Sequence, residues 1–339
     1  MTQGRPIGVL GAGSFGIALA AHWAKHGHPV RLWARREDLA RELRETRQSS
    51  DYLPGVELPA GVRITTELRD LVGCDPVIVA VPSYGFRDVV RSLAAVWPRD
   101  EPLVVVSGAK GIEPKTLERM SEVTAEEAER AEREIAFGVL SGPSFAVELA
   151  QGAATASVIA SEDEALAKHL RQRLASPTFR LYSSTDVVGV EIGGAVKNVI
   201  AIAAGVVVGL KLGHNTLAAL ITRGLHEIAR LGLAYGGRQP TFAGLATLGD
   251  LVLTCTGDLS RNRAIGIALA EHKTREEATS GHQVAEGVRN SVAIVDLARR
   301  KGVEMPISEQ MAEVLYEGKD LHEALHELMT RELKSEAEL

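Results

Sequence analysis

The sequence of 339 residues is long enough for two domains, or for one large α/β unit with an extension. Its composition, with 45% apolar and 24% charged residues, is that of an ordinary globular protein and excludes extended disorder or a fibrous fold. A formal charge of −6 argues against a general nucleic-acid-binding protein, so we expect any anionic partner to be a small molecule.

Short β-rich runs alternate with helical stretches up to about residue 185. The runs read IGVL, VRLW, VRIT, PVIVAV, PLVVVS, IAFGVL, TASVIA and FRLYS. This alternation predicts an α/β fold with a mostly parallel sheet and helices on both faces. From Asp186 onward the spacing of apolar residues is helical throughout. We therefore predict an N-terminal domain over residues 1–188 and an all-helical C-terminal domain over residues 189–339.

The motif GAGSFG lies directly after the first predicted strand and opens a helical pattern. In such a G-x-G-x-x-G motif, Gly11 permits the tight turn, Gly13 lets a pyrophosphate approach the backbone, and Gly16 lets helix and strand pack closely. The N-terminus of the helix attracts the anion. The motif predicts that the N-terminal domain is of the Rossmann type and binds a dinucleotide.

Two arginines, Arg35 and Arg36, follow the second predicted strand, where NAD-preferring sites usually have an acidic residue. Guanidinium groups suit a 2′-phosphate, so we expect NADP(H) to be accepted, alone or together with NAD(H). The alternative is that one arginine stacks on the adenine and the other is solvated, which leaves the choice of cofactor open.

Three strand ends carry further candidates, because ligands of open α/β sheets bind beyond the carboxyl ends of the strands. They are VPS at residues 81–83, SGAKG at residues 107–111 and SGPS at residues 141–144. Lys110 follows a buried strand and could reach a carbonyl or a phosphate; the alternative is a surface lysine in a turn.

Lys197 lies in one of the most apolar segments of the chain, EIGGAVKNVIAIAAGVVVGL. Burial lowers the pKa of a lysine, and a second cation such as Lys110 would lower it further, which makes Lys197 a candidate general acid or base. The alternative is a lysine that extends to the surface. Asp250 and Thr254 share one helix face if GDLVLTC is helical, and Asp250 could orient Lys197 or simply start that helix.

The segment SRNR has Ser260 as a predicted helix N-cap, followed by Arg261 and Asn262 in the first turn. Basic residues at a helix N-terminus oppose the helix dipole, which suggests that a phosphate binds there. The alternative is that these arginines pair with carboxylates elsewhere.

The remaining features are consistent with a cytoplasmic protein. Cys74 and Cys255 lie far apart without metal-ligand spacing and are predicted to be reduced, and we expect no metal site. The N-terminal residues enter a strand without a signal-peptide pattern. The uncharged apolar run at residues 199–210 is too short for a bilayer and predicts a buried helix, so we expect no membrane span.

Taken together, GAGSFGIALA, SGAKGIE, SGPSFAVE, DVVGVEIGGAVKNVIAIAAG, AALITRG, GDLVLTC, SRNR and VAEGV resemble the bacterial NAD(P)-dependent glycerol-3-phosphate dehydrogenases. The resemblance extends in order from residue 7 to about residue 310. It implies a two-domain enzyme that reduces dihydroxyacetone phosphate to sn-glycerol 3-phosphate, a precursor of phospholipids.

The resemblance also implies roles for individual residues. Lys197 is the catalytic acid or base, assisted by Lys110 and Asp250. The implied cofactor-binding residues are Gly11, Gly13, Ser14, Phe15, Gly16, Arg35, Arg36, Lys110, Ala146, Arg261, Val284 and Glu286. The implied substrate-binding residues are Lys110, Gly142, Ser144, Lys197, Asp250, Thr254, Ser260, Arg261 and Asn262.

Two other functions compete with this one. One is a dehydrogenase that acts on a carboxylate substrate, against which the SRNR segment favours a phosphate. The other is a dinucleotide sensor without catalysis, against which Lys110, Lys197 and Asp250 argue. The apolar helices of the second half favour a homodimer.

Overall fold

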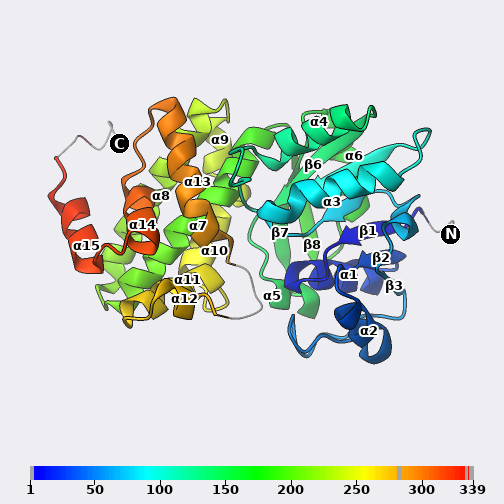
Figure 1. Ribbon diagram of the computed structural model, residues 1–339, viewed down its shortest axis with the longest axis horizontal. Helices are drawn as coiled ribbons and strands as arrows, with labels where there is room; N and C mark the ends of the chain where they lie inside the picture. The colour runs from blue at the N-terminus through cyan, green and yellow to red at the C-terminus, as the bar shows by residue number, and fades with distance from the viewer. Residues whose placement is uncertain (1–3, 281–284, 333–334, 336–339) are drawn as a thin grey trace. The chain divides into compact units, whose positions relative to one another are not determined.

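The chain folds into two compact units, which Figure 1 draws as the ribbon of a computed structural model. The structure describes residues 4–280, 285–332 and 335. Of the described residues, unit 1 comprises those up to Ala109 together with Glu118–Val187, and unit 2 comprises Lys110–Leu117 together with those from Val188 onward. The chain therefore enters unit 2 for eight residues before it returns to complete unit 1.

Unit 1 contains one sheet of eight strands in the order β3-β2-β1-β4-β5-β6-β7-β8. All neighbouring strands are parallel except β6 and β7, which are antiparallel. This confirms the predicted mostly parallel sheet. The strands are β1 (Ile7–Leu10), β2 (Val30–Trp33), β3 (Val62–Thr65), β4 (Val77–Val79), β5 (Leu103–Ser107), β6 (Ile135–Ser141), β7 (Thr155–Ala160) and β8 (Phe179–Ser184).

Helices cover both faces of this sheet, so its central strands are buried on both sides and read as apolar runs. Side chains of β4 show the alternation: Ile78 packs in one apolar cluster, while Val77 and Val79 pack in the other. The helices of unit 1 are α1 (Ser14–Lys25), α2 (Glu37–Thr46), α3 (Ser83–Val96), α4 (Met120–Arg130), α5 (Ala146–Gln151) and α6 (Glu164–Leu174).

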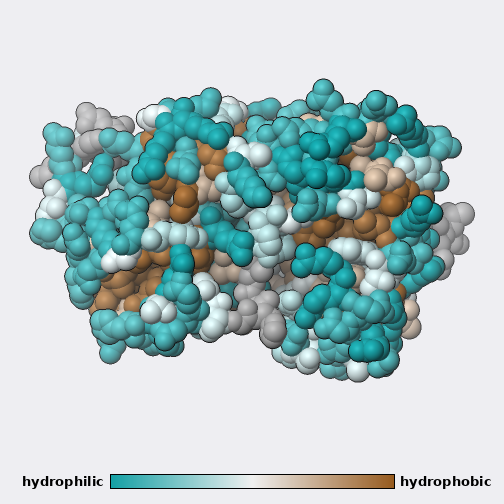
Figure 2. Space-filling view, viewed as in Figure 1, coloured by the Kyte–Doolittle hydropathy of each residue, from teal (hydrophilic) through white to brown (hydrophobic). Residues whose placement is uncertain are grey.

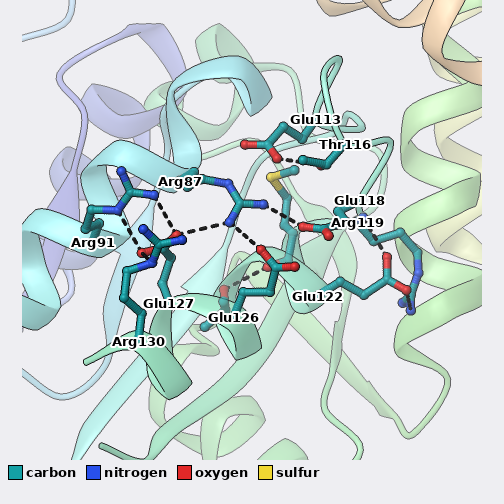
Figure 3. Close-up of polar contacts among 12 residues, drawn as sticks. Arg87, Arg91, Glu113, Thr116, Glu118, Arg119, Glu122, Glu126, Glu127 and Arg130 are labelled. Atoms are coloured by element: carbon teal, nitrogen blue, oxygen red, sulfur yellow. Dashed lines mark hydrogen bonds and ion pairs between the residues drawn. The ribbon is translucent and has the colours of Figure 1, made fainter. Parts of the chain in front are cut away.

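A set of ion pairs joins α3 to α4 on one face of the sheet (Figure 3). Arg87 contacts three carboxylates, those of Glu118 at 2.5 Å, Glu126 at 2.6 Å and Glu127 at 3.0 Å. Arg91 binds Glu127 with two hydrogen bonds, of 2.8 and 2.9 Å. We call this set the charge network; its members are Arg87, Arg91, Glu118, Glu126, Glu127 and Arg130.

Unit 2 is built around α7 (Val187–Gly209), which extends well beyond the apolar run that predicted it. By length and composition α7 could cross a membrane, but 89% of its apolar stretch is buried inside the protein, as in a core helix. The other helices are α8 (Gly213–Ala234), α9 (Gln239–Phe242), α10 (Asp250–Thr256), α11 (Arg261–Ala270), α12 (Arg275–Ala278), α13 (Glu286–Lys301), α14 (Pro306–Tyr316) and α15 (Leu321–Thr330).

The eight-residue excursion Lys110–Leu117, which we call the strap, packs into the helical unit. Ile112 and Leu117 are 1% and 8% exposed and belong to the apolar core formed by the helices. Arg300 of α13 donates a hydrogen bond to the carbonyl oxygen of Thr116. Residues 110–117 lie within the range 1–188 that the sequence predicts for the N-terminal domain, but in the structure they pack with the helices of unit 2.

Candidate functional site

In unit 1 the glycine loop joins β1 to α1 with very close backbone packing. Gly11 has a φ of +115°, and a Cβ atom built on Gly16 would lie only 1.8 Å from the carbonyl oxygen of Gly11. A Cβ on Gly13 would meet nothing within 4 Å, so the backbone there is open to a ligand. The first turn of α1 contains no acidic residue. These properties fit the pyrophosphate of a dinucleotide.

Phe15 and Ser14 form the first turn of α1 at the point where the strand order reverses, between β1 and β4. Ser14 is buried, and the ring of Phe15 lies 3.3 Å from where a Cβ on Gly108 would be. Gly108 directly follows β5, so the ring of Phe15 packs against the carboxyl end of that strand. Dinucleotides bind at such topological switch points.

The two arginines after β2 differ in their surroundings. Arg36 pairs with Asp51 at 3.3 Å and Asp38 at 3.6 Å, and its guanidinium lies 5.9 Å from the centre of the Tyr52 ring. Arg35 is exposed, and its side chain makes no ion pair or hydrogen bond with any residue that the structure describes. Of the two, Arg35 therefore has the charge that is available to a phosphate.

The SGPS motif follows β6 in unit 1. Gly142 has a φ of +143°, and a Cβ there would come within 2.9 Å of the Cα of Ser157 on β7. The Ser144 hydroxyl donates to the carbonyl oxygen of Gly142 at 3.0 Å, and Ala146 begins α5. Gly142 and Ser144 of this motif and Ala146 just after it thus follow the same strand end.

In unit 2, two lysines meet one carboxylate. Lys197 donates from Nζ to Oδ1 of Asp250 at 3.1 Å and to Oγ1 of Thr254 at 2.7 Å. Lys110 donates from Nζ to the other carboxylate oxygen, Oδ2 of Asp250, at 2.7 Å. We call these four residues the amine cluster: Lys110, Lys197, Asp250 and Thr254.

Elements distant in the sequence supply the amine cluster. Lys197 comes from the middle of α7, Lys110 from the strap, and Asp250 with Thr254 from one face of α10. Lys197 is only 5% exposed, which excludes a side chain that extends to the surface of the unit. Asp250 is the first residue of α10, which agrees with the alternative that it simply starts this helix. It is also 2% exposed and accepts hydrogen bonds from both ammonium groups.

The amine cluster changes the acidity of its members. Burial is the main cause that lowers the pKa of Lys197 to about 8; Asp250 opposes this change and the Lys110 ammonium contributes to it. Burial would raise the pKa of Asp250, but Lys110 and Lys197 outweigh it and hold that pKa below its ordinary value. Lys197 can therefore exchange a proton near neutral pH, beside an aspartate that stays ionised.

The N-terminus of α11 has the predicted cap. Ser260 accepts a hydrogen bond from the backbone N–H of Arg263, and Arg261 is exposed in the first turn. Asn262 is buried and bonds at both ends of its carboxamide: Nδ2 donates to Asn198, and Oδ1 accepts from the N–H of Gly287. Arg263 pairs with Asp258 at 2.9 Å, so the alternative of a carboxylate partner holds for this arginine.

Two implied residues precede or begin α13. Glu286 is its first residue, while Val284 lies outside the described residues. Sequence reasoning missed Asn290, further along α13, and named Asn198 without a role. Both donate to the carbonyl oxygen of Lys110. Asn198 gave a signal, as a polar residue in an apolar helix; Asn290 gave none, because its position is ordinary in an amphipathic pattern.

Within the described part of the chain, no group of three or more His, Cys, Asp or Glu residues is arranged so that it could hold a metal ion. The chemistry that this arrangement can perform is proton transfer at a buried amine, next to a helix N-terminus suited to an anion.

Comparison with protein families matches both parts of the chain. Residues 6–167 match the model of the NAD-dependent glycerol-3-phosphate dehydrogenase N-terminus, and residues 186–326 match that of the C-terminus. A protein of Geobacter sulfurreducens named glycerol-3-phosphate dehydrogenase [NAD(P)+] is 50% identical, over 97% of this chain and 98% of its own.

Solved structures give the same result. The crystal structure of a glycerol-3-phosphate dehydrogenase from Coxiella burnetii is 40% identical, with a TM-score of 0.91 over 97% of this chain and 99% of that one. The glycerol-3-phosphate dehydrogenase of Saccharomyces cerevisiae is 25% identical, with a TM-score of 0.79 over 97% of this chain and 100% of that one.

Proposed function

Since the chain belongs to the NAD-dependent glycerol-3-phosphate dehydrogenase family, we propose how its residues divide the work of that reaction. The protein is an oxidoreductase that reduces dihydroxyacetone phosphate to sn-glycerol 3-phosphate with NAD(P)H, reversibly. The observation that carries the proposal is the amine cluster, in which a buried amine with a lowered pKa lies beside an ionised aspartate.

Lys197 acts as the general acid in the reduction. NAD(P)H, when bound, supplies the hydride that adds to the ketone carbon of the substrate. Lys197 donates a proton from Nζ to the carbonyl oxygen, and in the reverse direction it removes the proton from the hydroxyl group. Asp250 holds the amine through its 3.1 Å hydrogen bond, and Thr254 fixes a second N–H. Lys110 binds substrate and cofactor with its ammonium group and lowers the pKa of Lys197.

The phosphate of the substrate binds at the N-terminus of α11. Support comes from the Ser260 cap, the positive end of the helix dipole and the exposed Arg261 in the first turn. Asn262 has one N–H left after its bond to Asn198 and can give it to the phosphate. Gly142 and Ser144 of unit 1 complete the set of substrate residues.

Arg261→Ala tests the phosphate site. We expect KM for dihydroxyacetone phosphate to rise about 10-fold or more, with kcat much less affected, because a charge-assisted contact to the phosphate is lost. Arg263→Ala is the matched control, since the Arg263 guanidinium already pairs with Asp258. An unchanged KM in the Arg261 variant would contradict the assignment.

The cofactor binds along the glycine loop of unit 1. Gly11, Gly13 and Gly16 form the cradle for its pyrophosphate, and Arg35 contacts a 2′-phosphate. In this proposal residues 1–188 supply most of the contacts to the dinucleotide and residues 189–339 most of the contacts to the substrate, with the strap contributing Lys110. The remaining cofactor contacts in this proposal are Ser14, Phe15, Arg36, Ala146, Arg261, Val284 and Glu286.

We further propose that the protein acts as a homodimer in the cytoplasm and supplies glycerol phosphate for phospholipid synthesis. Support for the dimer comes from an apolar pocket of about 430 Å³ between α7, α8, α14 and α15, which a second copy of the chain could cover. Figure 2 also shows apolar surface among the helices of unit 2. Light scattering after size exclusion measures the mass directly, and a monomer at micromolar concentration would exclude the dimer.

The substrate class is tested by following NADPH oxidation with a panel of ketones. Dihydroxyacetone phosphate should turn over rapidly, whereas 2-keto and 3-keto acids of similar size should react slowly or not at all. Turnover with a carboxylate substrate alone would replace the phosphate in this proposal. Binding of NADPH without any turnover would instead support a sensor.

A further inference from the structure

The backbone of Lys110 lies in neither a helix nor a strand, so the regular hydrogen bonds of such elements do not fix it. A lysine side chain is long and flexible, and the place of its ammonium group depends on where the backbone is held. The 2.7 Å contact between Nζ and Asp250 fixes only the far end of the side chain. Something must therefore position the near end.

Asn290 of α13 supplies this support. Its Nδ2 donates to the carbonyl oxygen of Lys110 at 3.2 Å, and its Oδ1 accepts from the backbone N–H of Ile112 at 3.3 Å. One carboxamide thus bonds peptide groups on both sides of Gly111. Asn290 is 0% exposed and Ile112 is 1% exposed, so water cannot easily replace either hydrogen bond.

A second asparagine shares the same acceptor. Asn198, next to Lys197 on α7, donates from Nδ2 to the Lys110 carbonyl oxygen at 3.1 Å, and its Oδ1 accepts from Asn262 at 2.9 Å. The Lys110 carbonyl therefore receives two N–H groups, which occupy both of its lone pairs.

Close packing of α13 against α7 creates this arrangement. A Cβ built on Gly287 would lie 2.5 Å from the carbonyl oxygen of Asn198, so only glycine lets α13 approach α7 there. Asn290 follows Gly287 by three residues and so shares its helix face. The face of α13 that packs against α7 therefore also carries the side chain that bonds the strap.

We infer that Asn290 is a positioning residue for the reaction: its carboxamide holds the strap backbone, and thereby the Lys110 ammonium, beside Asp250 and Lys197. The inference rests on the proposed role of Lys110. Burial of Ile112 and Leu117 anchors the strap in the helical core, whereas Asn290 sets the orientation of the peptide that carries the lysine.

The primary test is Asn290→Leu, which keeps the approximate size and removes both hydrogen bonds. We expect KM for dihydroxyacetone phosphate to rise and kcat to fall, together about 10-fold or more in kcat/KM. The pH midpoint of kcat should move upward, as in Lys110→Met, because a cation that opposes protonation of Lys197 is no longer held in place. Asn290→Ser, which is smaller and still polar, serves if the leucine variant folds poorly.

Ser291→Ala is the matched control. Ser291 is the next residue of α13, is equally buried, and bonds only the carbonyl oxygen of Val288 in its own helix among the described residues. Its loss should lower thermal stability without moving KM or the pH midpoint. If Asn290→Leu behaves in the same way, with only stability affected, Asn290 is structural and the inference is overturned.

A double-mutant cycle separates this inference from the function that it builds on. If Asn290 acts through Lys110, the losses of kcat/KM in Asn290→Leu and Lys110→Met should not add in the double variant. Additive losses would overturn the role of Asn290 while leaving Lys110 in place. Normal kinetics in Lys110→Met alone would instead contradict the role of Lys110 in the proposed function.

Discussion

Unit 1 and unit 2 each contain a cluster of ion pairs, and the two differ in balance and burial. The charge network has three arginines and three glutamates, and several of its side chains are largely exposed, such as Arg130 at 62% and Glu126 at 49%. The amine cluster has two ammonium groups for one carboxylate, and the side chains of Lys197 and Asp250 are only 6% and 2% exposed.

This difference shows how the same interaction serves two purposes. A balanced, partly solvated network joins two helices, and its charges are satisfied within the protein. A buried cluster with one more positive than negative charge costs free energy, and in the function proposed above an anionic substrate relieves that cost. The excess of positive charge, rather than the presence of ion pairs, is what makes the amine cluster the candidate site.

Removal of the central amine should have the largest effect. We expect Lys197→Met to lower kcat about 1,000-fold, because general acid catalysis of this kind contributes about 10²- to 10⁴-fold. Cofactor affinity should remain nearly normal. The control is Arg91→Met, which deletes a cation from the charge network and should leave kcat unchanged; comparable losses in both variants would remove the distinction between the clusters. Steady-state kinetics and NADPH titration provide the measurements.

The converse experiment is Glu127→Gln in the charge network. The Glu127 side chain is 0% exposed and binds Arg87 and Arg91, so its loss should lower the stability of unit 1 by about 2 kcal/mol. All three tryptophans, Trp23, Trp33 and Trp97, lie in unit 1, so fluorescence during urea unfolding reports on that unit. The activity of the folded protein should not change, and a loss of kcat would contradict a purely structural role.

Arg35 and Arg36 also differ in whether their charges are paired within the protein. Arg36 is paired with two aspartates, whereas Arg35 has its charge available. Arg35→Ala should therefore raise KM for NADPH about 10-fold and leave KM for NADH nearly unchanged. Arg36→Ala should affect both cofactors slightly and equally. A larger preference change in the Arg36 variant would show that pairing within the protein does not predict availability to a phosphate.

The smallest effect concerns pH. Lys197 must be protonated to act as an acid, so kcat for reduction should fall as pH rises through about 8, while kcat for oxidation should rise over the same range. Lys110→Met should move both midpoints to higher pH, since Lys110 opposes protonation of Lys197. At pH 7 about nine-tenths of the amine is already protonated, so only the full profile reveals the shift. Identical midpoints would mean that Lys110 does not act on Lys197.

Much of the fold could be predicted from the sequence, because its strands are buried and continuous apolar runs. Four strands match the predicted runs residue for residue, β1, β2, β3 and β7, and the others differ at their ends. The N-terminal half of α7 had a weaker signal: the uncharged apolar run predicted only the second half, and burial of residues such as Ile192 in the helical core extends the helix toward Val187.

The candidate site was less accessible to sequence reasoning. Lys197 was recognisable because an amine in an apolar helix requires an explanation, and the segment around Asp250 indicated a shared helix face. The strap gave no indication of its partners, since residues 110–117 have neither helical nor alternating spacing. Asn290 could not be predicted for another reason. The sequence alone does not distinguish a buried asparagine that bonds the backbone of a distant loop from an asparagine in solvent.

The strap also constrains how these enzymes can recombine. A gene fusion that exchanged only the region from Val188 onward would combine the helices of one parent with the strap of the other. Ile112 and Leu117 would then pack in a foreign core, and the amine that faces Asp250 would come from the wrong parent. Exchange of the helical unit is therefore expected to succeed only when the coding sequence for the strap and that for the region from Val188 onward come from the same parent.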